Sequence, residues 1–231
     1  EVGGMSDISL YSVEKGSGAP LILLHGNGEN GAYFARQIEY FSRFFRVIAV
    51  DTRGHGRSPR GEAPFTIRQF AEDLRAFMDE KAVEKADLLG FSDGGNIALV
   101  FALRYPERVN RLILNGANLS GGGVKARYQL PIVLGWRIAS LFAGRSEKAR
   151  RNAEMLGLMV NDPAIDPEAL CAVKSKTLVI AGTRDMIRER HTRLIAEKIP
   201  GAQLALLPGS HFVAAENPEA FNRAVAEFLG A

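Results

Sequence analysis

Six short apolar runs, separated by segments with helical periodicity, constrain the fold of this 231-residue chain more than any other feature. The runs are rich in Val, Ile and Leu and occupy residues 20–25, 46–51, 86–90, 109–115, 177–182 and 203–207. Continuous apolar runs of this length are typical of strands buried on both faces of a parallel sheet. Apolar residues recur at helical spacing in residues 31–42, 66–81, 94–105, 188–199 and 217–229. The alternation predicts an α/β fold with a doubly wound, mostly parallel sheet.

Two segments depart from this alternation. Residues 8–13 form an additional apolar run that ends in a short glycine-rich connection, which predicts an antiparallel edge strand. Residues 117–176 contain helical pieces at 128–142, 147–160 and 167–173 without a strand between them. We therefore expect a single domain over residues 5–231, with a small helical cap at 117–176 inserted after the sixth strand. Residues 1–4 precede Met5 and look like a cloning remnant, so they are left out of the fold prediction.

Composition excludes several classes of protein. The chain is 46% hydrophobic and 24% charged with a net charge of +3, and its charges alternate in sign, so no nucleic-acid partner is expected. Its apolar runs are far shorter than the roughly 20 residues that cross a bilayer, so no membrane partner is expected either. The single cysteine, Cys171, and the lack of a secretion signal favour the cytoplasm. No metal-binding spacing of Cys and His occurs, so we expect neither a metal nor a cofactor. We also expect a monomer or a weak homo-oligomer.

A candidate nucleophile lies between the strand at 86–90 and the helix that follows it. Gly90-Phe91-Ser92-Asp93-Gly94 fits the pattern G-x-S-x-G. This pattern marks a sharp strand-to-helix turn that exposes a serine hydroxyl, with glycines where the chain passes close to itself. Ser92 is therefore the predicted nucleophile.

A serine nucleophile requires a base and an acid that orients the base. Three histidines lie at a strand end, in a glycine-rich loop and inside a predicted helix: His25, His55 and His191. His211 alone follows the last strand, and Asp185 lies three residues beyond the end of the preceding strand. The order Ser92, Asp185, His211 is the one expected of an α/β-hydrolase.

These motifs resemble those of the α/β-hydrolase fold superfamily from about residue 8 to the end of the chain. Leu24-His25-Gly26-Asn27-Gly28 is similar to its oxyanion loop, and residues 51–58 are similar to its D-x-R-G-x-G-x-S stretch. The resemblance implies that the backbone N–H groups of Asn27 and Asp93 bind an oxyanion. The Asp-Gly-Gly after Ser92 is also similar to biphenyl-hydrolase-like members, which accept amino-acid esters. That similarity implies a carboxylate at Asp93 that pairs with a substrate ammonium group.

Other interpretations compete with this one. Residues 26–31 read G-x-G-x-x-G, and Asp51 follows about 20 residues later, as in a dinucleotide-binding fingerprint. That interpretation leaves the elbow and the acid and histidine at the strand ends unexplained, whereas the hydrolase interpretation makes Asp51 and Arg53 structural. The simpler alternatives are a helix-capping role for Ser92, a surface histidine at His211 and a turn aspartate at Asp185.

The sequence therefore predicts a cofactor-free serine hydrolase, an esterase that cleaves small carboxylic esters through an acyl-enzyme. Ser92 would attack the carbonyl, His211 would transfer the proton, and Asp185 would orient the imidazole. Alternatives on the same fold are a lactonase, thioesterase, perhydrolase or carbon–carbon bond hydrolase, and a different class is a ligand-sensing relative without turnover. The residues expected to line the substrate pocket are Phe91, Asp93, Tyr128, Trp136, Met155, Met159 and Phe212.

Overall fold

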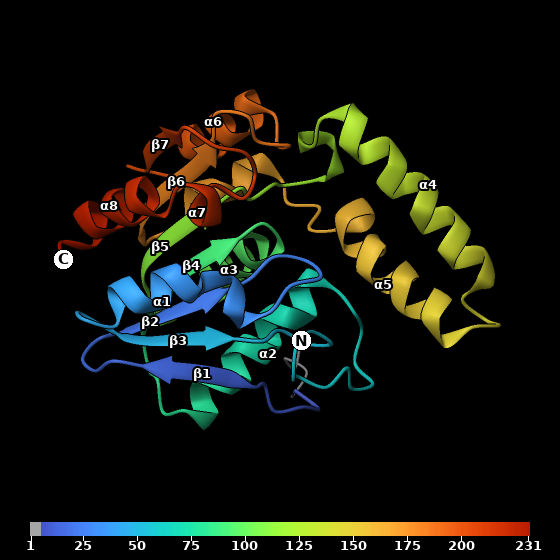
Figure 1. The fold of residues 1–231 in the computed structure, drawn as a ribbon, viewed down its shortest axis with the longest axis horizontal. Coiled ribbons are helices and arrows are strands. Elements are labelled where there is room, and N and C mark those ends of the chain that lie inside the picture. Colours follow the sequence, from blue (N-terminus) through green and yellow to red (C-terminus); the bar gives the residue numbers. More distant parts are fainter. Residues whose placement is uncertain (1–5) are drawn as a thin grey trace.

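A seven-stranded sheet forms the centre of the molecule in the computed structural model, which describes residues 6–231; the expectation for residues 1–4 lies outside this range. The strands are β1 (Ser12–Lys15), β2 (Pro20–Leu24), β3 (Arg46–Val50), β4 (Ala86–Phe91), β5 (Val109–Asn115), β6 (Lys176–Gly182) and β7 (Gln203–Leu207). Their order is β1-β3-β2-β4-β5-β6-β7, and β1 alone among them runs antiparallel to its neighbour. The predicted mostly parallel α/β sheet is confirmed (Figure 1).

Helices cover both faces of this sheet. The longer ones are α1 (Ala35–Phe41), α2 (Ile67–Glu80), α3 (Asp93–Arg104), α4 (Ala126–Phe142), α5 (Glu147–Asn161), α6 (Glu189–Lys198) and α8 (Pro218–Leu229). The shorter ones are α7 (Val213–Glu216) and the 3₁₀ turns η1 (Gly31–Phe34), η2 (Pro106–Arg108), η3 (Gly121–Gly123) and η4 (Pro167–Ala172). Strand β2 shows how the core divides: Ile22 and Leu24 pack with α2, α3 and α6, whereas Leu21 and Leu23 pack with α1 and α8. Because alternate side chains point to opposite faces, a strand buried on both faces must be apolar throughout.

The edge strand lies later in the chain than predicted. Residues 8–13 were expected to form it, but pairing with β3 begins at Ser12, opposite Val50. The backbone N–H of Tyr11 instead donates to the Ser58 hydroxyl, and Leu10 is buried against the α2 side of the core. Ile8 and Leu10 are therefore apolar because they pack against the core as part of an irregular segment, while the predicted antiparallel pairing is correct.

The cap lies between β5 and β6, where α4 and α5 form an antiparallel pair that extends from the carboxyl end of the sheet (Figure 1). The chain between these two strands, residues 116–175, contains η3, α4, α5 and η4. The cap follows the fifth strand, one earlier than the predicted sixth, because the described chain has four strands before β5 and none between β5 and the cap. None of the helices within residues 6–231 combines the length and apolar character required to cross a membrane.

Candidate active site

Ser92 lies at the sharp turn between β4 and α3. Its φ of 54° and ψ of −120° place it in a region that non-glycine residues rarely adopt. The flanking glycines permit this turn, because a Cβ on Gly90 would lie 2.2 Å from the carbonyl oxygen of Gly94, and one on Gly94 would lie 2.0 Å from that of Leu24. The Ser92 side chain makes no capping hydrogen bond to α3. This geometry argues against the helix-capping alternative.

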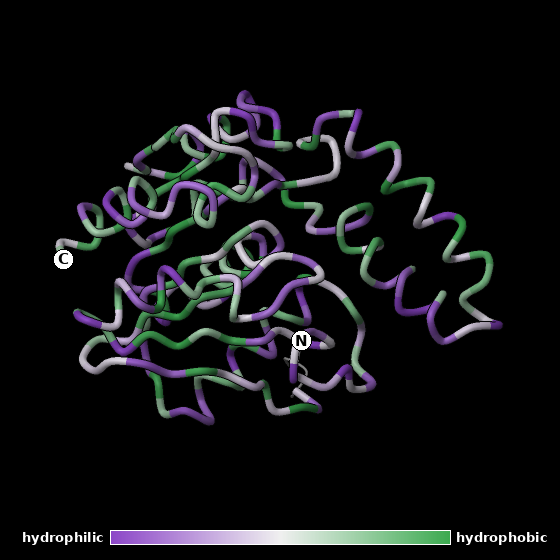
Figure 2. Tube along the Cα trace, viewed as in Figure 1, coloured by the Kyte–Doolittle hydropathy of each residue, from purple (hydrophilic) through white to green (hydrophobic). Residues whose placement is uncertain are grey.

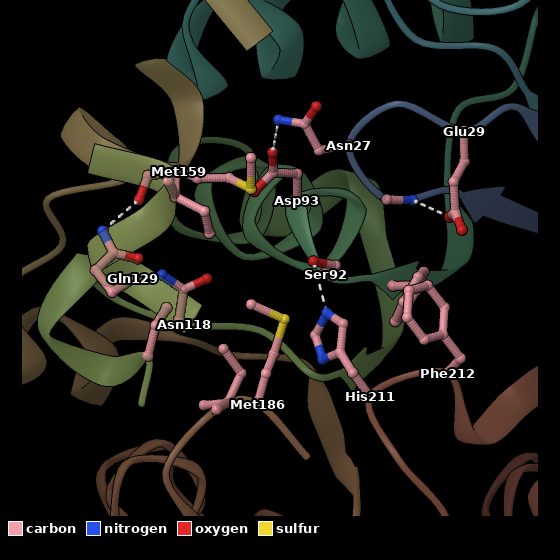
Figure 3. A pocket seen from close by; sticks show the side chains of 15 residues that line it. Asn27, Glu29, Ser92, Asp93, Asn118, Gln129, Met159, Met186, His211 and Phe212 are labelled. Atoms are coloured by element: carbon pink, nitrogen blue, oxygen red, sulfur yellow. Dashed lines mark hydrogen bonds between the residues drawn. The ribbon is translucent and has the colours of Figure 1, made fainter. Parts of the chain in front are cut away.

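His211 and Asp185 complete a chain of hydrogen bonds from Ser92, of which Figure 3 shows the bond between Ser92 and His211. The distance from Ser92 Oγ to His211 Nε2 is 3.0 Å, and that from His211 Nδ1 to Asp185 Oδ1 is 2.7 Å. His211 and Asp185 are both buried. The loop after β7 reaches this position because Gly182 has no side chain, since a Cβ there would lie 2.0 Å from the carbonyl oxygen of Ser210. The structure thus brings together three residues from three separate strand ends, as the sequence predicted.

Asp185 is held by the backbone of a neighbouring residue as well as by the histidine. Its Oδ1 accepts a hydrogen bond from the Ile187 N–H at 2.8 Å, which fixes the carboxylate orientation. Its Oδ2 is buried without a hydrogen-bond partner among residues 6–231. A buried carboxylate bonded to Nδ1 keeps the other ring nitrogen directed at the serine hydroxyl.

The loop after β2 presents Asn27 beside the start of α3. Within the described chain, neither the backbone N–H of Asn27 nor that of Asp93 donates to a protein acceptor. Unpaired N–H groups at a helix start are suited to bind a developing negative charge. The Asn27 side chain donates to Asp93 Oδ2 at 2.9 Å and to the Met155 carbonyl at 2.7 Å, so this loop is attached both to the elbow and to the cap.

A buried histidine holds the same loop in position through two hydrogen bonds. His25 Nδ1 lies 2.7 Å from the Gly26 carbonyl oxygen, and Nε2 accepts the Thr52 N–H at 3.0 Å. These two bonds require a neutral ring with its proton on Nδ1. Burial lowers the pKa of His25 to about 4, which keeps the ring neutral. His25 is therefore a positioning residue for the loop that carries Asn27.

Two carboxyl groups flank the serine. Asp93 is buried and accepts hydrogen bonds from the side-chain amides of Asn27 and Asn96, at 2.9 and 3.3 Å. Burial raises the pKa of Asp93 to about 6, and the hydrogen bond from Asn27 partly offsets this rise. Glu29 lies on the other side, where it accepts the Gly26 N–H at 3.2 Å, and burial also raises its pKa.

A cavity of about 340 Å³ opens above Ser92 and His211. Four of the seven predicted pocket residues line it, namely Phe91, Asp93, Met159 and Phe212. The sequence analysis missed other lining residues, namely Glu29, Asn118, Val124, Gln129, Ile132, Met186 and Ile187. Asn118 follows the carboxyl end of β5, and this position was a signal that sequence reasoning could have used.

The other three predicted pocket residues lie elsewhere. Trp136 faces a separate groove with Phe65 and Glu154, because its ring packs over Gly157 of α5. Tyr128 points outward beneath the Arg127 guanidinium, 4.8 Å from its ring centroid. Met155 contributes its carbonyl oxygen to Asn27 and does not line the cavity. These three predictions were wrong.

The residues of the competing fingerprint have structural roles. Asp51 accepts the backbone N–H of Gly31 at 2.7 Å and that of Arg57 at 2.9 Å, so both carboxylate oxygens are used inside the protein. Arg53 is fully buried and pairs with Asp73 and Asp7. This arrangement argues against dinucleotide binding. Among residues 6–231, no three His, Cys, Asp or Glu side chains gather as a metal site.

The comparisons place the chain in a known family. A model described as the alpha/beta hydrolase fold matches residues 19–138, just over half of the chain, so the chain belongs to the α/β-hydrolase fold family. A protein of Caulobacter sp. (strain K31) named as a carbamate hydrolase, RutD, is 30% identical over 90% of both chains. The 2-hydroxymuconate semialdehyde hydrolase of Pseudomonas putida is 29% identical over 94% of this chain and 89% of its own. The enol-lactonase structure from Burkholderia xenovorans LB400 superposes with a TM-score of 0.78, at 25% identity and 98% coverage of both chains.

Proposed function

We propose that this protein is a serine hydrolase that cleaves small carboxylic esters through an acyl-enzyme. The observation that carries the proposal is the hydrogen-bonded series Ser92, His211 and Asp185 at the base of a cavity. Family membership and relatives named as hydrolases support hydrolytic chemistry.

In this mechanism Ser92 Oγ attacks the ester carbonyl carbon while its proton passes to His211 Nε2. The carbonyl oxygen becomes an oxyanion, which accepts hydrogen bonds from the N–H groups of Asn27 and Asp93. The alcohol then leaves with the proton from His211, and the acyl group stays on Ser92. Water next attacks the acyl carbon, with His211 again acting as base, and this step releases the acid. Each oxyanion donor is worth about 3 to 4 kcal/mol of barrier in comparable sites.

The charges around the cavity define the preferred ester. Among residues 6–231, its lining includes two carboxyl groups, Asp93 and Glu29, and no lysine or arginine. An anionic substrate would therefore meet repulsion without a compensating cation. The relative named for 2-hydroxymuconate semialdehyde acts on a compound with a carboxylate. Because the lining of this cavity offers no cation to pair with such a group, the cavity favours a neutral or cationic substrate instead. We extend the proposal to amino esters, with the Asp93 carboxylate pairing with the α-ammonium group.

The first test measures hydrolysis of p-nitrophenyl butyrate. Ser92→Ala should lower kcat by several orders of magnitude, because the members of such a set act as a unit. The matched control is Ser175→Ala, which removes a buried hydroxyl without a hydrogen-bond partner among residues 6–231, immediately before β6. Near-normal turnover by folded Ser92→Ala would refute the proposal. Absence of wild-type turnover on esters, thioesters and lactones would favour the ligand-sensing alternative.

The second test separates the substrate preference from the reaction. An α-amino ester and its des-amino analogue are compared for wild type and Asp93→Asn. Ammonium recognition predicts a loss of about 10- to 150-fold in kcat/KM for the amino ester alone. Equal losses on both substrates would exclude this role for Asp93 and leave the serine mechanism intact.

A further inference from the structure

The outer face of α4 is exposed although it is apolar. Leu130, Leu134, Ile138 and Leu141 follow each other at helical spacing and lie within about a quarter of the helix circumference. Leu130 is 68% exposed and Leu141 is 77% exposed. Hydrophobic positions recur along the whole helix (Figure 2), and no residue of α4 is buried. A row of large apolar side chains this exposed normally packs against protein or lipid, so this face lacks its partner.

The opposite face of the same helix is already occupied. Gln129 and Ile132 line the active-site cavity, and Trp136 packs over Gly157 of α5. The exposed leucines are therefore not needed for the cavity or for the contact between α4 and α5. They require a separate explanation.

The charge around this face is strongly basic. Helix α4 contains Arg127 and Arg137 and no acidic residue. Basic residues gather at the tip of the α4–α5 pair, where all are exposed: Arg145, Lys148, Arg150 and Arg151. The one acidic residue between 137 and 151 is Glu147, which pairs with Arg151 at 2.6 Å. Arg137, Arg145, Lys148 and Arg150 have no ion-pair partner within the part of the chain that the structure describes.

We propose that the α4 outer face and the basic α4–α5 tip dock on an anionic lipid surface. The leucines enter the boundary between headgroups and acyl chains, and the basic side chains contact the anionic headgroups. A second copy of this chain fits the face less well, because apposing two α4 helices brings arginines together without an acidic residue on either helix. The expectation of no membrane partner rested on the lack of a spanning segment, and peripheral docking requires none.

Docking would hold the active-site cavity about one helix diameter, roughly 10 Å, from the lipid surface. The helix that presents the leucines outward also lines the cavity with its inner face. Substrates that partition into the membrane would then be held close to Ser92. The lipid contact itself is independent of the serine chemistry, so vesicle binding can be measured on the whole protein whether or not esters are hydrolysed.

The test is sedimentation of the whole protein with vesicles of phosphatidylcholine, with and without about 30% phosphatidylglycerol. We expect binding to the anionic vesicles and little to the neutral ones. The emission of Trp136, the single tryptophan of the chain, provides a second readout because it lies on α4. Neutralising each basic residue should weaken partition about fivefold, so the Arg137→Gln and Arg145→Gln double variant should bind about 25-fold more weakly. A Leu134→Ser and Leu141→Ser double variant should lose about tenfold or more.

Controls change one exposed apolar residue and one basic residue away from the cap, at Phe44→Ser and at Arg223→Gln on α8. Neither control should alter vesicle binding, and none of the cap variants should alter hydrolysis of a short water-soluble ester. Equal binding to neutral and anionic vesicles, or unchanged binding by the cap variants, would overturn the proposal. A wild-type dimer in sedimentation equilibrium that the leucine variant abolishes, without vesicle binding, would identify a second copy as the occupant instead.

Discussion

Asp93→Asn should stabilise the protein in a manner that depends on pH. Burial raises the pKa of Asp93 from 3.8 to about 6. The folded state therefore binds a proton more readily than the unfolded state between these values. The stability that protonated Asp93 contributes to the folded state is present below pH 3.8 and is lost as the pH rises through about 6. A rise of about two pKa units at 1.36 kcal/mol per unit amounts to about 2 to 3 kcal/mol.

The asparagine variant cannot ionise, so it does not incur this loss. Its changed hydrogen bonds with Asn27 and Asn96 shift stability by an amount that does not depend on pH. The measurement is the free energy of unfolding in urea at about pH 4 and about pH 8 for both proteins. Between these values the variant should gain about 2 to 3 kcal/mol relative to wild type. A stability difference that is the same at both pH values would refute the assignment of a destabilising buried carboxylate.

Three further predictions concern the loop, the turn and the cavity. His25 is held neutral with its pKa lowered from 6.5 to about 4. The stability that the neutral ring contributes to the folded state is therefore present above pH 6.5 and is lost as the pH falls toward 4. Between about pH 7 and 4.5, the free energy of unfolding of His25→Gln in urea should therefore fall by about 2 to 3 kcal/mol less than that of wild type. Equal falls in the two proteins would contradict this. Ser92→Gly should raise the free energy of unfolding by about 1 kcal/mol or more by relieving the positive φ, while ester hydrolysis disappears; a destabilised variant would show that the turn is not strained. Met159→Ala should change KM for p-nitrophenyl esters more than Trp136→Phe does, because Met159 lines the cavity and Trp136 does not. The reverse order would place the substrate in the separate groove lined by Trp136.

The sheet and the three residues at its strand ends were predictable because their constraints are local. A strand buried on both faces must be apolar throughout, as Leu21 to Leu24 are. The elbow requires glycine where the chain passes within about 2 Å of a hypothetical Cβ, as at Gly94. Such requirements leave their mark on the sequence directly.

The cap side of the cavity was not predictable for a physical reason. Helix α4 carries apolar residues on several sides, so its periodicity does not tell which residues meet the cavity. The large aromatic residues Tyr128 and Trp136 were therefore preferred over Gln129 and Ile132, which line the cavity in the structure. Glu29 was missed because nothing in a polar loop sequence indicates that its carboxyl folds back against Gly26.

The most direct test of the proposed mechanism is covalent labelling with a fluorophosphonate, which reacts with activated serines. Intact mass followed by peptide mapping would count the phosphonyl groups and locate them. The mechanism predicts one group per chain, on Ser92, with no labelling of Ser92→Ala and loss of ester hydrolysis in step with labelling. Label on a different serine, or ester hydrolysis that persists after Ser92 is fully modified, would contradict it.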